Sequence, residues 1–176
     1  PQLNKEGLII DDRANGGGNV SPMILERLSR EPYRLTMRRG SARIGTVPDA
    51  VQVGPKVCLI NKYSASDGDL FPWGFRALGL GKLIGTRTWG GIVGISGSLP
   101  YMDGTDIRVP FFTSFDPKTG SWIIENHGVD PDILIDNDPV KEWNGEDQQL
   151  DRAIQEVMKE LQDRKPLPGV PTPRDF

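Results

Sequence analysis

Ser66 has a sequence context that suits a nucleophilic serine. It follows a short apolar run at residues 57–60 that predicts a buried strand, and a helix can begin directly after it at Asp67. The backbone N–H groups after such a serine have no helical partner, and with the helix dipole they suit a developing oxyanion. The same residues also have a structural interpretation, because Ser64, Ser66 and Asp67 are all common N-cap residues.

A second segment repeats this pattern nearer the N-terminus. Residues 7–12 predict a buried strand, three consecutive glycines at 16–18 predict a turn, and a helical pattern follows from about Val20. Glycines allow positive φ and let a backbone N–H approach another group closely. Phosphate binding is a weak alternative, because no Gly-Lys-Ser/Thr follows and the spacing differs from that of dinucleotide sites.

Together the two segments resemble the tail-specific serine peptidases, peptidase family S41, and within them the tricorn branch. The matching motifs are DDRANGGG at 11–18, SASDGD at 64–69, GTRTWGG at 85–91 and ENHGVDPD at 125–132. The resemblance implies a serine peptidase that cleaves peptides through an acyl-enzyme. It assigns the nucleophile to Ser66 and the carboxylate that assists the base to Glu125. The oxyanion hole would be formed by backbone N–H groups of Asp67 and of Gly17 or Gly18.

The general base of such a peptidase is missing from the chain. One branch of the family uses a lysine, but Gly91 takes its place in the resembling motif. The tricorn branch uses a histidine from a segment N-terminal to the glycine-rich strand, whereas the only histidine here, His127, matches a position that is not the base. We therefore expect the base to come from outside this chain, which would be incomplete alone. The alternative is a catalytically inactive, tricorn-like peptide-binding or scaffolding module.

Hydrophobic patterns place these motifs in an α/β fold with mainly parallel central strands and an antiparallel, β-rich C-terminal half. Helices are predicted at about 20–30, with Ser21 as cap, at 69–80 and at 148–162. A loop is predicted at residues 44–55, and a strand at 122–124 precedes Glu125. The resemblance implies a crotonase/ClpP-like core. We expect a catalytic core at 1–164 and an extended, proline-rich tail at 165–176.

Composition and resemblance also limit cofactors and partners. No metal ion or organic cofactor is implied, since Asp67-Gly68-Asp69 lacks the further oxygen ligands of a calcium loop. A net charge of −3 does not support nucleic-acid binding, and no apolar run is long enough to span a membrane. By resemblance we expect peptide or unfolded-protein substrates, contacts with upstream segments of the same protein, and a homo-oligomer. The expected location is the cytoplasm, or the periplasm or exterior if a signal peptide precedes the chain.

Two further features have ordinary structural interpretations. Cys58, the only cysteine, lies in an apolar run without an adjacent base, so we expect a buried hydrophobic residue rather than a reactive thiol. A basic run is typical of a solvated face, although in a peptidase it could contact an acidic substrate terminus. This run consists of Arg34, Arg38, Arg39 and Arg43.

Overall fold

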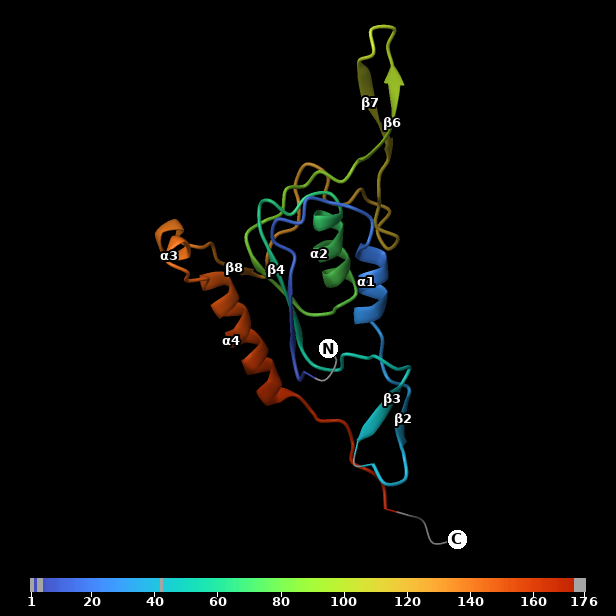
Figure 1. The fold of residues 1–176 in the computed structure, drawn as a ribbon, viewed down its shortest axis with the longest axis vertical. Helices are drawn as coiled ribbons and strands as arrows, with labels where there is room; N and C mark the ends of the chain where they lie inside the picture. The colour runs from blue at the N-terminus through green and yellow to red at the C-terminus, as the bar shows by residue number, and fades with distance from the viewer. Residues whose placement is uncertain (1, 3–4, 42, 173–176) are drawn as a thin grey trace.

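A parallel sheet forms the centre of the protein. The computed structural model describes residue 2, residues 5–41 and residues 43–172 (Figure 1). Four strands lie in the order β1-β4-β5-β8, and each neighbouring pair is parallel. The carboxyl ends of parallel strands lie at one edge of the sheet, so the turns after β1 and β4 are neighbours. The strands are β1 (Leu8–Asp11), β4 (Lys56–Ile60), β5 (Lys82–Gly85) and β8 (Ile133–Leu134).

Helices cover both faces of this sheet. Helices α1 (Ser21–Leu28) and α2 (Asp67–Ala77) lie on one face, and α4 (Gln148–Asp163) lies on the other (Figure 1). Successive side chains of a strand point to opposite faces, so β4 contributes to two hydrophobic clusters. Cys58 and Ile60 belong to the cluster that contains Leu25, Phe71 and Phe75, whereas Val57 and Leu59 belong to the one that contains Ala153 and Val157.

Two antiparallel hairpins extend from opposite ends of the molecule (Figure 1). One pairs β2 (Arg34–Met37) with β3 (Ile44–Val47), and the other pairs β6 (Gly94–Pro100) with β7 (Asp106–Phe112). The second hairpin confirms the antiparallel segments predicted after the central strands. The predicted loop at 44–55 is wrong in its first part, where β3 forms. Gly45 lies opposite Thr36 in this pairing, and a methyl group on it would lie 2.8 Å from Thr36 Oγ1.

The α/β class with mainly parallel central strands is confirmed, whereas the crotonase/ClpP-like detail and the 1–164 core boundary stay predictions. A short helix, α3 (Pro139–Trp143), was not predicted, although Asp138 as N-cap followed by Pro139 is a helix-start signal. Residues 164–172 of the chain follow α4 without helix or strand, and the tail residues 173–176 lie outside the described residues. No helix in the described ranges is both long and apolar enough to cross a membrane.

Candidate active site

Ser66 occupies the turn between β4 and α2, as its sequence context predicts. It is the N-cap of α2, with φ 57° and ψ −113°. This backbone conformation is rare for a residue with a side chain and costs about 1–3 kcal/mol, so surrounding contacts must hold it. One such contact is the bond that Ser66 N donates to Asp69 Oδ2, at 2.9 Å.

The glycine turn after β1 packs directly against Ser66. A methyl group in place of the Gly17 hydrogen would lie 2.9 Å from Ser66 Cβ and 3.2 Å from Ser66 Oγ. Ala65 N donates to Asn15 O at 2.8 Å, which joins the two turns through their backbones. Gly68 is required at this junction, because a methyl group there would lie 2.2 Å from Asn15 O. The structure thus brings together the two motifs that the sequence singled out.

The amides around Ser66 differ in what they bond. Gly17 N donates to Asn15 Oδ1 at 3.1 Å and is therefore already engaged. Among the residues that the structure describes, no protein group accepts from Gly18 N or from Asp67 N. Asp67 N belongs to the first turn of α2, where N–H groups have no helical acceptor. Both amides thus lack an acceptor within the described chain, and Gly18 directly follows the glycine that packs against Ser66.

The Asp67 carboxylate has a structural partner that the sequence did not reveal. It accepts from Val20 N and Ser21 N, each at 3.0 Å, and also bonds the Ser21 hydroxyl. The predicted capping role of Ser21 is therefore wrong, because Val20 is the N-cap of α1 and the capping oxygen comes from Asp67. This contact fixes the start of α1 against the start of α2.

Asp69 connects the Ser66 turn to the segment after β5. Its buried carboxylate accepts from Gly90 N at 2.7 Å and from Gly91 N at 3.2 Å, besides Ser66 N. Sequence reasoning missed this residue as a part of the site. The available signal was its place three residues after Ser66, where the acidic residue of a capping box returns to the N-cap amide.

Glu125 continues the same network. Its Oε2 accepts from Ile92 N at 2.7 Å and from Val93 N at 2.9 Å, directly after the glycine pair that Asp69 binds. The strand predicted at 122–124 is wrong: Trp122 forms only an isolated bridge to Phe115, and Glu125 lies in a turn. Among the described residues, Glu125 and Ser66 form no direct bond. The role of Glu125 as the carboxylate that assists the base stays a prediction.

Neither His127 nor Cys58 is arranged as a base or nucleophile beside Ser66. His127 is exposed, and its Nε2 lies 2.7 Å from Asp130 Oδ2. It lines an open pocket of about 440 Å³ with Lys62, Thr86 and Trp89. Cys58 is fully buried in β4, and this burial raises the pKa of its thiol well above the usual value. The expectation of an inert thiol agrees with this environment.

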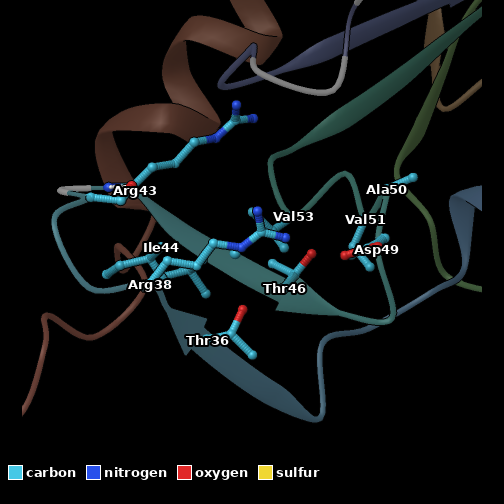
Figure 2. Close-up of a pocket in the computed structure, with 12 residues that line it drawn as sticks. Thr36, Arg38, Arg43, Ile44, Thr46, Asp49, Ala50, Val51 and Val53 are labelled. Atoms are coloured by element: carbon cyan, nitrogen blue, oxygen red, sulfur yellow. Dashed lines mark hydrogen bonds between the residues drawn. The ribbon is translucent and has the colours of Figure 1, made fainter.

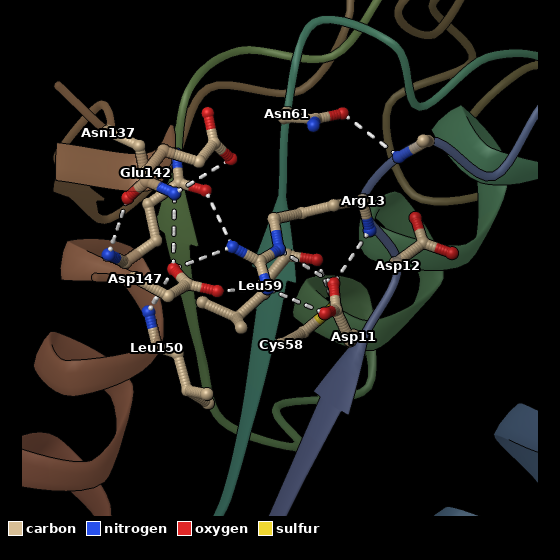
Figure 3. Close-up of polar contacts among 12 residues, drawn as sticks. Asp11, Asp12, Arg13, Cys58, Leu59, Asn61, Asn137, Glu142, Asp147 and Leu150 are labelled. Carbon is tan, nitrogen blue, oxygen red and sulfur yellow. Dashed lines mark hydrogen bonds and ion pairs between the residues drawn. The ribbon is translucent and has the colours of Figure 1, made fainter. Parts of the chain in front are cut away.

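Arg13 holds the carboxyl end of β1 to the start of α4 (Figure 3). Its guanidinium bonds the Asp11 carboxylate, Asp147 Oδ1 at 2.9 Å and Gln149 Oε1 at 3.1 Å. The hydrogen bond from Arg13 lowers the pKa of Asp147 to about 2, and a bond from the same guanidinium also lowers the pKa of Asp11. These contacts hold the end of β1 rigidly in place.

The basic run does not meet Ser66 within this chain. Arg38, Arg43 and Asp49 line a pocket of about 670 Å³ on the β2–β3 hairpin (Figure 2). This hairpin precedes the amino end of β4, whereas Ser66 follows its carboxyl end, so the two sites lie at opposite edges of the sheet. Over the described ranges, no three His, Cys, Asp or Glu side chains form a metal-binding group.

Comparison with known proteins assigns the family. Residues 2–135 match the family model described as Peptidase family S41. The chain belongs to peptidase family S41. This S41 chain is 42% identical over 167 residues to tricorn protease from Thermoplasma volcanium, an alignment that covers 93% of the chain and 16% of that protein. It is 37% identical over 172 residues to tricorn protease homolog 1 from Streptomyces coelicolor, covering 97% of the chain and 16% of that protein.

A solved structure supports the same relationship. The crystal structure of the tricorn protease matches this S41 chain with a TM-score of 0.82 and 40% sequence identity. The match covers 91% of the present chain and 16% of the solved one. The resemblance to the tricorn branch is confirmed, and the S41 chain spans about one sixth of the length of the curated relatives that it matches.

Proposed function

We propose that this S41 chain is the core of a serine-type peptidase with Ser66 as its nucleophile. The observation that carries the proposal is the backbone of Ser66, at φ 57° and ψ −113° on a strand-to-helix turn. A strained turn of this kind presents a serine hydroxyl above the edge of a sheet, as in the nucleophile elbows of other hydrolases. Membership in a peptidase family supports the same role.

The oxyanion hole in this proposal consists of Asp67 N and Gly18 N. A tetrahedral intermediate requires preorganised donors that are not already bonded to another acceptor. Gly17 N fails this requirement because it donates to Asn15 Oδ1. The choice between Gly17 and Gly18, which the sequence leaves open, therefore falls on Gly18.

The proposed reaction is acyl transfer in two steps. A histidine from a segment outside this chain takes the proton of Ser66 Oγ as that oxygen attacks the peptide carbonyl, and it then gives the proton to the leaving amine. Water hydrolyses the resulting ester in the same way. Glu125 orients the imidazole and stabilises its charged form, while two backbone N–H groups keep the carboxylate in place. This chemistry calls for no metal ion or organic cofactor.

The substrates and assembly belong to the same proposal. We infer peptide or unfolded-protein substrates, because the family and the named relatives are peptidases. The 16% coverage of those relatives supports a chain that works with further segments of a longer protein. A homo-oligomer and a cytoplasmic location are carried over from the tricorn likeness alone.

The test compares Ser66→Ala with Ser121→Ala, an exposed serine just after the turn at 117–119, in the full-length protein. Hydrolysis of unstructured peptides should fall at least about a thousandfold in Ser66→Ala, because loss of a catalytic nucleophile leaves only binding and the oxyanion donors. Ser121→Ala should retain wild-type rates. The 176-residue chain alone should turn over peptides poorly, since its only histidine pairs with Asp130.

The missing base favours a second function, an inactive peptide-binding or scaffolding module. That function predicts peptide binding without turnover in the full-length protein and equal binding by wild type and Ser66→Ala. Robust turnover that survives Ser66→Ala would reject both the nucleophile and this alternative.

A further inference from the structure

Asp12 is a buried acidic residue that the proposed chemistry does not use. It follows β1 directly with 6% of its surface exposed, and its Oδ1 accepts from Asn15 Nδ2 at 2.9 Å. Its Oδ2 has no hydrogen-bond partner, the single such case among the buried side-chain nitrogen and oxygen atoms of the described residues. Unpartnered buried polar atoms are rare in folded proteins, so this one requires an explanation.

The partner of Asp12 holds the glycine turn. Asn15 Oδ1 accepts from Gly17 N at 3.1 Å, and Asn15 O accepts from Ala65 N at 2.8 Å. The side-chain amide accepts only through its oxygen and donates only through its NH₂ group, so its oxygen must face Gly17 N and its nitrogen must face an acceptor. Asp12 supplies that acceptor and thereby selects the orientation in which Asn15 fixes Gly17 beside Ser66.

The charge of Asp12 changes within the physiological range. Burial raises its pKa to about 7, against the hydrogen bond from Asn15, and the nearby carboxylates of Asp67, Asp11 and Asp69 raise it further. Ionised Asp12 can only accept, which allows a single orientation of the Asn15 amide. Protonated Asp12 carries a donor, which permits the reversed amide and leaves Gly17 N facing an NH₂ group.

We propose that Asp12 is a positioning residue that orders the glycine turn through Asn15 when its carboxyl group is ionised. The regulation that this adds to the site rests on the proposed function of Ser66. As the pH rises through neutrality, the Gly17 backbone becomes fixed and Gly18 N is held beside the nucleophile. As the pH falls, the turn gains a second arrangement in which that donor is misplaced.

The test follows the Gly17 amide by ¹H–¹⁵N NMR between pH 5 and pH 9 in the 176-residue chain. All samples carry His127→Gln, which removes the single imidazole of the chain. We expect the Gly17 resonance to shift with a midpoint near pH 7 and to stay constant when Asp12→Asn is added. Asp12→Leu, which removes the acceptor, should accelerate Gly17 amide exchange at least about tenfold.

Three results would overturn the proposal: a Gly17 resonance that does not titrate, a titration that persists in Asp12→Asn, or unchanged exchange in folded Asp12→Leu. If Asp12→Leu does not fold, the Asp12→Asn comparison decides.

In the full-length protein, Asp12→Leu should lower kcat about tenfold or more with little change in KM, since misplacing a catalytic group acts on the reacting complex. The NMR result does not depend on peptidase activity. The Gly17 titration can therefore be absent although Ser66→Ala abolishes turnover, and it can be present although Ser66→Ala retains turnover.

Discussion

Replacing Asp12 by asparagine should change how the stability of the protein depends on pH. The pKa of Asp12 is about 7 in the folded state against a usual value of 3.8. Between these values the folded state holds a proton that the unfolded state has released. The free energy of unfolding of the wild type should therefore decrease as the pH rises from about 4 to 7 and stay at its lower value above pH 7. Below pH 3.8, Asp12 should cause no loss of stability. A rise from 3.8 to about 7 corresponds to about 4 kcal/mol.

Urea unfolding of wild type and Asp12→Asn at pH 5, 6, 7 and 8 measures this effect. The asparagine oxygen can still accept from Asn15, but its NH₂ group takes the place of the unpartnered oxygen at a cost of about 1–3 kcal/mol. This cost does not depend on pH. The free energy of unfolding of the variant, relative to wild type, should therefore increase with pH by a few kcal/mol between pH 5 and pH 8.

Asp106→Asn is a matched control, because it makes the same side-chain change at an exposed position, the first residue of β7. Its stability difference from wild type should stay flat over the same range. A flat difference for Asp12→Asn as well, or one that decreases with rising pH, would refute the reasoning that burial holds the proton on Asp12.

Three further predictions concern the rest of the network. Glu125→Gln should keep the two amide bonds but lower kcat in the full-length protein about tenfold to a thousandfold with little change in KM, whereas a structural carboxylate would leave steady-state kinetics unchanged. Arg13→Gln should cost about 2 kcal/mol in urea unfolding at pH 7, and this loss should shrink as the pH falls from about 4 to 2 because its carboxylate partners become protonated. In thermal melts, Gly68→Ala should lower the stability by about 3 kcal/mol or more, because its methyl group would contact Asn15 O. Gly16→Ala should be neutral in the same measurement, since a methyl group there has no neighbour within 4 Å.

The turn at Ser66 could be predicted because several local signals agree. An apolar run, a serine and an acidic residue in the first helical turn all favour a strand that ends and a helix that begins within six residues. The last helix was equally accessible, since its apolar positions repeat at helical spacing from Gln148 onward. Such elements are specified mostly by their own residues.

Other elements depend on partners that are distant in sequence. Strand β8 has only two residues and exists because Ile133 and Leu134 pair with β5. The segment before Glu125 carries an apolar pattern typical of a strand, yet only Trp122 finds a bridging partner. The strain at Ser66 also has no local signature, because its positive φ follows from bonds on both sides of the turn.

The site is built from carboxylates that accept backbone N–H groups of other segments. Asp67 holds the start of α1, Asp69 holds the glycine pair at 90–91, and Glu125 holds the two amides that follow. A carboxylate bonded to two successive amides holds a loop more firmly than a single backbone bond, because two adjacent peptide units are anchored to one charged group. Within the described chain this arrangement engages the amides around Ser66 and leaves Gly18 N and Asp67 N without an acceptor. Rigid surroundings and unengaged donors are the two conditions that electrostatic stabilisation of an oxyanion requires. In the proposed mechanism, these donors therefore stabilise the transition state together with Glu125.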